Sequence, residues 1–243
     1  MYIEEKILTC QGIHVYQVLP ENPDGLMIWY HGWSSWANGQ LSRARVYAHA
    51  GWQVLIPEMI HHDSRGKIDY DAPESYPYFW QTILQNIRET ANWIHYAQEQ
   101  GHSHIVVNGH SMGGYTALGA AAHYPEIKAA VAINGSWHWP LSHLFMEARF
   151  AMRCHLEEHL WQEINAFSPH QARQLPPLLL LHGEIDPSVD PRANQQFAHL
   201  MQARGFHIDY ESTPLLGHYV TTSMLDRSID WLANIRKNKG SHQ

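Results

Sequence analysis

Short apolar runs that do not alternate with polar positions recur along most of the chain. They occupy residues 25–32, 52–59, 103–110, 128–135 and 177–184. Runs of this length without alternation are typical of strands that are buried on both faces of a sheet. The pattern therefore predicts a central sheet built mostly from parallel strands, and the segment HIDYEST at 207–213 completes it as a last strand.

The first twenty residues follow a different pattern. Residues 2–9 and 13–20 alternate in polarity, and a short turn containing glycine separates them. Alternation predicts strands with one face in water, and a short turn between two such strands predicts an antiparallel hairpin. We therefore expect an N-terminal antiparallel hairpin ahead of the parallel strands.

Segments with helical periodicity lie between most of the buried apolar runs. Residues 79–100 place apolar side chains at spacings of three or four, and 112–123, 192–204 and 222–236 also fit helices. An alternating order of strands and helices predicts an α/β fold, with helices covering both faces of the sheet. The length of 243 residues fits one such domain, spanning 1–243.

About 40 residues between Gly135 and Pro177 interrupt this alternation. Their apolar stripe predicts a small helical cap insertion at about 136–175, over the edge where the parallel strands end. An ordinary long crossover is the alternative, although crossovers usually need fewer residues. The residues of the stripe are Phe145, Met152, Leu156, Leu160 and Ile164. After the last helix, residues 237–243 predict a disordered tail.

Charge and composition narrow the range of partners and compartments. The chain has 23 acidic and 16 basic residues and a net charge of −7, with no block of Lys and Arg, so nucleic acid is not an expected partner. No apolar run is long enough to span a bilayer, and residues 1–10 lack the pattern of a signal or transit peptide. Cys10 and Cys154 are interpreted as free thiols in a reducing compartment, which favours the cytoplasm.

The segment GHSMG at 109–113 fits the G-x-S-x-G motif, between a predicted strand and a predicted helix. In this motif the serine occupies a strained turn, and the glycines let strand and helix approach while the hydroxyl projects outward. The Met112 amide would lie at the N-terminus of the helix, directed toward an anion beside Ser111. The motif predicts that Ser111 is a nucleophile, and an ordinary turn serine is the alternative.

A serine hydroxyl is a poor nucleophile without a neighbouring base. Among the 20 histidines, His218 follows the strand at 207–213 and precedes the last helix. The reacting groups of an α/β sheet gather at the carboxyl ends of its strands, which is where this loop would lie. We therefore expect His218 to be the base, and a solvated loop histidine is the alternative.

The base needs an acid that orients it, and that acid should also follow a strand. The buried run at 177–184 leads directly to Asp186, which is the preferred candidate. Asp190 lies farther along and could belong to the start of the next helix, whereas Glu184 directly follows the turn glycine. Both remain alternatives to Asp186.

Four short motifs together resemble the α/β-hydrolase family. They are YHGW at 30–33, GHSMGG at 109–114, LHGEID at 181–186 and LGH at 216–218. The chain is most similar to small bacterial carboxylesterases, akin to dienelactone hydrolases and to the catalytic domain of prolyl-oligopeptidase-type peptidases. Dienelactone hydrolases have cysteine where this chain has Ser111, and the peptidases carry a propeller with no counterpart here, so neither substrate is transferred.

The resemblance implies a serine hydrolase that cleaves carboxylic esters of small to medium acyl groups through an acyl-enzyme intermediate. It implies an oxyanion hole made by the backbone N–H groups of Trp33 and Met112, with Ser34 as the alternative to Trp33, and a loop held by His31. A thioesterase, an amidase or a peptidase could use the same triad, and a non-catalytic binding protein could share the fold. No cofactor is expected.

Substrate contacts and metal sites carry weaker signals. Trp137 and Trp36 follow predicted strand ends, where they could wall an acyl pocket, although core packing explains such residues equally well. The HHD segment at 61–63 and the pair His155 and His159 contain metal-ligating side chains. Neither set has a third or fourth ligand at fixed spacing, so no metal site is predicted.

Overall fold

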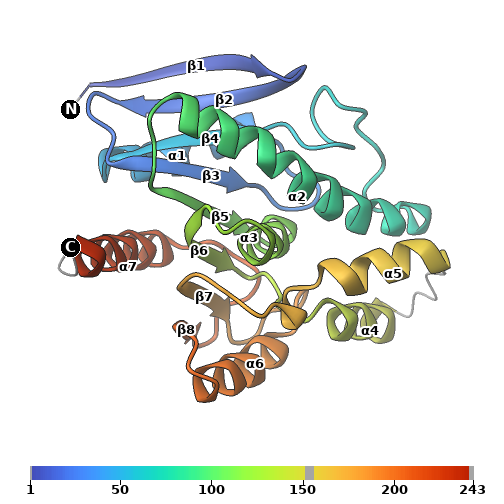
Figure 1. The fold of residues 1–243 in the computed structure, drawn as a ribbon. Helices are drawn as coiled ribbons and strands as arrows, with labels where there is room; N and C mark the ends of the chain where they lie inside the picture. The colour runs from blue at the N-terminus through green and yellow to red at the C-terminus, as the bar shows by residue number, and fades with distance from the viewer. Residues whose placement is uncertain (1, 151–155, 241–243) are drawn as a thin grey trace.

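The computed structural model describes residues 2–150 and 156–240. Within these residues one eight-stranded sheet runs through the molecule, with the strand order β1-β2-β4-β3-β5-β6-β7-β8 (Figure 1). The strands are β1 (Ile3–Cys10), β2 (Ile13–Pro20), β3 (Gly25–Tyr30), β4 (Trp52–Pro57), β5 (Ile105–His110), β6 (Ile127–Ile133), β7 (Leu178–Gly183) and β8 (Ile208–Thr213).

Strand directions agree with the sequence pattern. The hairpin of β1 and β2 is antiparallel, and β2 pairs antiparallel with β4. The remaining neighbours, from β4 through β3, β5, β6 and β7 to β8, are parallel. The predicted N-terminal hairpin and mostly parallel sheet are confirmed, so the carboxyl ends of six strands meet at one edge.

Helices cover both faces of the sheet (Figure 1). The helices α1 and α7 pack on one face, whereas α2, α3 and α6 pack on the other. Their bounds are α1 (Leu41–His49), α2 (Tyr76–Glu99), α3 (Met112–His123), α4 (Trp139–Phe150), α5 (Glu158–Phe167), α6 (Pro191–Ala203) and α7 (Thr222–Gly240).

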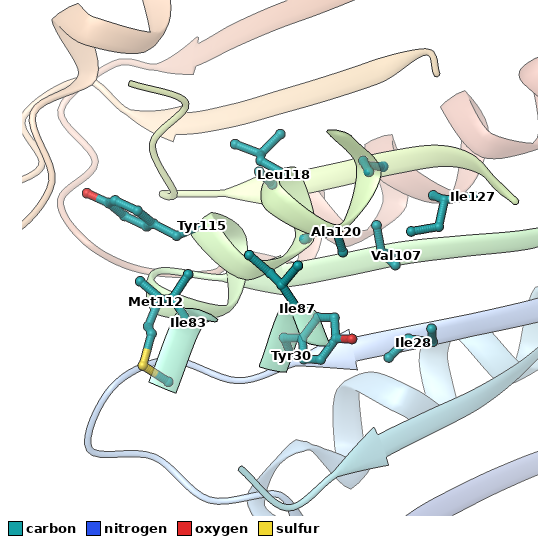
Figure 2. Packing of buried hydrophobic residues seen from close by; sticks show 14 of the residues in the cluster. Ile28, Tyr30, Ile83, Ile87, Val107, Met112, Tyr115, Leu118, Ala120 and Ile127 are labelled. Atoms are coloured by element: carbon teal, nitrogen blue, oxygen red, sulfur yellow. The ribbon is translucent and has the colours of Figure 1, made fainter. Parts of the chain in front are cut away.

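Alternate side chains of each central strand enter different hydrophobic clusters. In β3, Leu26 and Ile28 join the cluster beneath α2 and α3, whereas Met27 and Trp29 join the cluster beneath α1 and α7. Figure 2 shows the first cluster, where Ile83 of α2 lies among residues of α3 and the strands. Burial on both faces explains why these strands lack polar alternation.

Two segments differ from the sequence prediction. Helix α1 was not predicted, although Leu41, Ala44, Tyr47 and Ala48 follow helical spacing and the last three are buried. The predicted disordered tail was wrong in part, because α7 continues as a helix to Gly240. Residues 241–243 lie outside the described part of the chain.

The segment for which a cap insertion is predicted contains α4 and α5, which lie between β6 and β7 and beyond the carboxyl ends of the strands (Figure 1). Leu160 and Ile164 of the apolar stripe are buried, and α5 contacts α2. Met152 and Cys154 lie outside the described residues. Cys10 is a free cysteine, and burial raises the pKa of its thiol.

A long loop between β4 and α2 also reaches the edge where the parallel strands end. Arg65 holds this loop to α2 through two hydrogen bonds to Glu89, of 2.8 and 2.7 Å. The same guanidinium donates to the carbonyl oxygen of Glu58 at 2.8 Å. Glu89 is buried, so its charge depends on Arg65 for compensation.

Replacing Arg65 with leucine should lower the free energy of unfolding by about 3–5 kcal/mol, because the buried Glu89 carboxylate loses its cationic partner and keeps only the neutral Gln85 amide as a donor. The matched control is Arg88→Leu, since Arg88 binds Glu163 at 2.8 Å where both side chains are exposed. That change should cost about 1 kcal/mol or less. Urea denaturation of both variants measures the difference, and equal losses would contradict the role given to Arg65.

Candidate active site

Ser111 lies in a strained turn between β5 and α3. Its φ and ψ are 56° and −123°, a conformation that L-residues rarely adopt and that the surrounding structure must hold in place. The Ser111 amide donates to the carbonyl oxygen of Ile133 at 2.9 Å, and its own carbonyl oxygen accepts from the Gly114 amide at 2.7 Å. These bonds fix the turn at the edge where the parallel strands end.

The two outer glycines of the motif permit the close approach of strand and helix. A Cβ atom added to Gly109 would lie 2.2 Å from the carbonyl oxygen of Gly113. One added to Gly113 would lie 2.0 Å from the carbonyl oxygen of Tyr30, at the end of β3. Any larger residue at either position would displace the turn that carries Ser111.

The structure brings the three predicted residues of the triad into one chain of hydrogen bonds. His218 places Nε2 2.8 Å from Ser111 Oγ and Nδ1 2.7 Å from Asp186 Oδ2. Because an ionised carboxylate only accepts hydrogen bonds, Nδ1 carries the proton and Nε2 is left with its lone pair. The Ser111 hydroxyl can therefore donate to Nε2, which is the arrangement that activates a serine.

Asp186 lies buried in the loop after β7. Burial alone would raise its pKa, but hydrogen bonds from His182 and His218 outweigh burial and hold the pKa well below its usual value. The amides of Ser188 and Val189 also donate to Oδ1, at 2.7 and 3.0 Å. These donors keep Asp186 ionised and fix the direction of its carboxylate.

The other two acid candidates have different surroundings. Asp190 is the N-cap of α6, where it accepts from the Arg192 amide at 2.9 Å and pairs with the Arg192 guanidinium. Glu184 is exposed. Of the three candidates, Asp186 is the one that His218 contacts.

The loop after β3 runs beside Ser111. A Cβ atom added to Gly32 would lie 3.2 Å from the Cβ atom of Ser111. The Trp33 and Met112 amides make no hydrogen bond within the described parts of the chain, so both can face a ligand. Ser34 follows with a positive φ of 59°, and it remains the alternative donor.

His31 joins this loop to the next one. Its ring is fully buried, with Nδ1 2.9 Å from the carbonyl oxygen of Gly32 and Nε2 3.5 Å from Asp63 Oδ2. The Asp63 carboxylate in turn accepts from the Ala37 amide at 3.2 Å. The contacts agree with the role that the sequence suggests for His31, which is to hold the loop after β3.

Ser111 and His218 open into a cavity of about 450 Å³. Its walls come from the loop after β3, the loop before α2, the start of α2, helix α4 and the loop after β7. The lining residues are Trp33, Ser34, Tyr70, Asp71, Ala72, Tyr76, Phe79, Ser111, Met146, Ser188, Val189 and His218. A second cavity of about 250 Å³ shares Met146, Ser188 and Val189 with the first.

The prediction that Trp137 and Trp36 wall an acyl pocket was wrong. Trp137 is fully buried and stacks on Phe197 with ring centroids 4.4 Å apart. Trp36 is 57% exposed and lies over Gly39, outside the lining of the cavity. The aromatic walls come instead from residues such as Tyr70 and Phe79, whose segments the sequence did not connect with Ser111.

A second histidine lies against the ring of His218. The His110 and His218 rings have centroids 4.9 Å apart. Burial, with smaller contributions from His218 and Arg43, lowers the pKa of His110 to about 3. His110 is therefore neutral at ordinary pH and adds no charge beside His218.

Within residues 2–150 and 156–240, no three His, Cys, Asp or Glu side chains gather as a metal site would need. His155 of the pair noted in the sequence lies outside these residues. None of the helices described there combines the length and apolar character needed to cross a bilayer.

The model of the prolyl oligopeptidase family matches residues 83–237, a stretch that contains Ser111, Asp186 and His218. The chain belongs to the prolyl oligopeptidase family. The resemblance suggested by the four short motifs is thereby confirmed at the level of the family.

Two bacterial proteins that are similar in sequence to this chain are named as esterases. The YitV protein of Bacillus subtilis, named as a candidate esterase, is 34% identical over 46% of this chain and 44% of its own length. The esterase YjfP of Escherichia coli is 30% identical over 52% of each. The chain thus spans about half the length of the curated relatives that it matches.

A solved structure shows the same fold over nearly the whole chain. The TT1662 protein of Thermus thermophilus has a TM-score of 0.78 and 18% identity, with 97% of this chain and 98% of that chain covered. The α/β-hydrolase fold expected from the sequence is confirmed.

The buried His62 predicts how stability changes with pH. Burial lowers the pKa of His62 to about 4, whereas an unfolded histidine has a pKa near ~6.5. Between these values the unfolded chain binds a proton that the folded chain excludes, so stability falls as pH falls. Lowering the pH from about 7 to 5 should cost about 2 kcal/mol through this residue.

His62→Gln should remove that part of the pH dependence when urea denaturation is measured at both pH values. His159→Gln is the control, because the His159 side chain is exposed and should leave the difference as in the wild type. A pH dependence that His62→Gln leaves unchanged would show that the folded protein accommodates the charged ring.

Proposed function

We propose that this protein is a serine hydrolase that cleaves carboxylic esters of small to medium, uncharged acyl groups. The observation that carries the proposal is the chain of hydrogen bonds from Asp186 through His218 to Ser111, on a strained turn that opens into a cavity. This arrangement supports nucleophilic catalysis by a serine with an activated hydroxyl.

The reaction begins when Ser111 Oγ attacks the ester carbonyl carbon and His218 Nε2 takes the hydroxyl proton. The carbonyl electron pair moves to the oxygen, and the amides of Trp33 and Met112 stabilise the oxyanion. When the bond to the alcohol oxygen breaks, His218 returns the proton to that oxygen. Water then repeats the sequence on the acyl-enzyme, with His218 as its base and Asp186 holding the ring.

The cavity supports an uncharged acyl group. Its walls include the aromatic rings of Trp33, Tyr70, Tyr76 and Phe79 together with Met146, and a volume of about 450 Å³ lies within the range of small-molecule sites. The esterase names of YitV and YjfP favour esters. The family name favours a peptidase as the second candidate, which would use the same residues.

Labelling with a fluorophosphonate probe tests the proposal directly. The wild-type protein should label and should hydrolyse short p-nitrophenyl esters, because the probe reacts with an activated serine. Ser111→Ala should abolish both signals while the fold, checked by circular dichroism, is retained. Absence of labelling in a folded wild-type protein would favour a non-catalytic binding protein.

The acid is tested by a pair of matched substitutions. Asp186→Asn should keep the fold and lower kcat by roughly 10⁴-fold, since the neutral amide no longer fixes the imidazole tautomer. Asp190→Asn should leave kcat close to the wild-type value, because asparagine also caps helices well and the carboxylate bound to His218 Nδ1 is that of Asp186. The reverse result would move the acid to Asp190.

Acyl preference is tested at a residue that lines both cavities. Met146 lines both, so Met146→Ala should join them and shift the optimum of kcat/KM toward longer acyl chains. Leu144→Ala is the control, because Leu144 lies on the same helix but is 55% exposed. The series runs from acetyl to dodecanoyl esters, and an optimum that Met146→Ala does not move would place the acyl group elsewhere.

A further inference from the structure

A second histidine, His182 near the end of β7, binds the carboxylate of Asp186. Its ring is fully buried, with Nε2 3.2 Å from Asp186 Oδ2 and 3.1 Å from the carbonyl oxygen of Val189. Both of these oxygens are acceptors, because one belongs to a backbone carbonyl group and the other to the ionised carboxylate of Asp186. His182 must therefore carry a proton on Nε2, and it donates toward both oxygens.

The other ring nitrogen of His182 faces Asn194 of α6. The Asn194 amide cannot be reversed, because Oδ1 accepts from the Trp137 amide at 3.0 Å and Nδ2 donates to the carbonyl oxygen of Gly135 at 2.7 Å. The remaining hydrogen of Nδ2 points at His182 Nδ1, 3.1 Å away. Nδ1 must therefore accept, so it carries no proton.

The hydrogen-bonding role of each His182 ring nitrogen is thus set by a partner whose own position is fixed. The backbone around Gly135 and Trp137 orients Asn194, Asn194 orients His182, and His182 donates to Asp186. Asp186 Oδ2 is shared between two imidazole donors, His182 and His218, while Oδ1 takes two backbone amides. A carboxylate oxygen shared between two donors offers less negative charge to each of them.

We propose that His182 and Asn194 are positioning residues for the triad, and that His182 limits how strongly Asp186 stabilises the protonated ring of His218. This inference rests on the proposed function, because it assigns the two residues a role in the same proton transfer. A histidine held as one neutral tautomer can moderate Asp186 without adding a charge to the buried site.

Other titratable groups also face this part of the site. His110 lies against the His218 ring, Arg43 of α1 acts on His110, and Tyr115 of α3 lies in the field of Asp186. All three remain in each variant below, so they are common to every comparison; His182 itself also contributes to lowering the pKa of His110.

Two substitutions at His182 separate the two ring nitrogens. Glutamine places its amide nitrogen near the position of Nε2, so His182→Gln keeps the donor to Asp186, whereas His182→Asn places its amide near Nδ1 and removes that donor. In His182→Asn, Asp186 should stabilise the protonated His218 ring more strongly. The acidic limb of the kcat/KM profile should then move to higher pH, by about half a unit or more.

The loss of orientation in His182→Asn should also lower kcat by roughly tenfold to a hundredfold, the range expected for one hydrogen bond to a charged group. His182→Gln should restore most of kcat and the wild-type pH profile. The control is His104→Asn. His104 directly precedes β5, at the end of the strand away from Ser111, and its ring packs on Trp52. This change should lower thermal stability without moving the pH profile of kcat/KM.

Two results would reduce His182 to a structural role and overturn the proposal. One is a pH profile of kcat/KM that does not move in His182→Asn, and the other is a His182→Gln variant with a kcat as low as that of His182→Asn. Nitrogen-15 NMR of His182 in the wild-type protein gives a test that needs no activity. It should show a proton on Nε2 and none on Nδ1 at the pH of the activity assay. A proton on Nδ1 would also overturn the proposal, whether or not the protein hydrolyses esters.

Discussion

The arrangement of this molecule depends on one close approach, between the first turn of α3 and the ends of β3 and β5. A side chain at Gly113 would collide with the carbonyl oxygen of Tyr30, and one at Gly109 would collide with Gly113 itself. This contact forces Ser111 into its positive-φ turn and leaves the N-terminus of α3 beside the loop after β3. The positions of Ser111, the candidate nucleophile, and of both candidate oxyanion donors therefore depend on the absence of a side chain at Gly109 and Gly113.

A second constraint concerns charge. Asp186 is a buried carboxylate, and desolvation opposes its ionised form unless donors surround it. Two backbone amides and two imidazoles supply those donors, and each imidazole is oriented by its own further partner. The electrostatic requirement of one buried group thus organises the end of β7, the start of α6 and the loop that carries His218.

The sequence predicts those parts of the molecule whose signal is local. Buried strands appear as apolar runs, and the G-x-S-x-G motif predicts that Ser111 lies in the turn between a strand and a helix. The cavity could not be predicted, because its walls join segments far apart in the chain, such as Tyr70, Phe79 and Met146. Trp137 shows the same limit, since its place after β6 is visible in the sequence but the turn of its ring toward Phe197 is not.

Helix α1 was missed for a related reason, because its buried face consists of Ala44, Tyr47 and Ala48, and two alanines give little apolar signal. Small residues suit that face, since α1 packs against both the sheet and α7. There the Tyr47 hydroxyl lies 2.6 Å from Ser228 of α7 and accepts from Asn108 of β5 at 2.8 Å. Asn108 directly precedes the motif that holds Ser111, so the face of the sheet covered by α1 and α7 also supports the strand that leads to Ser111.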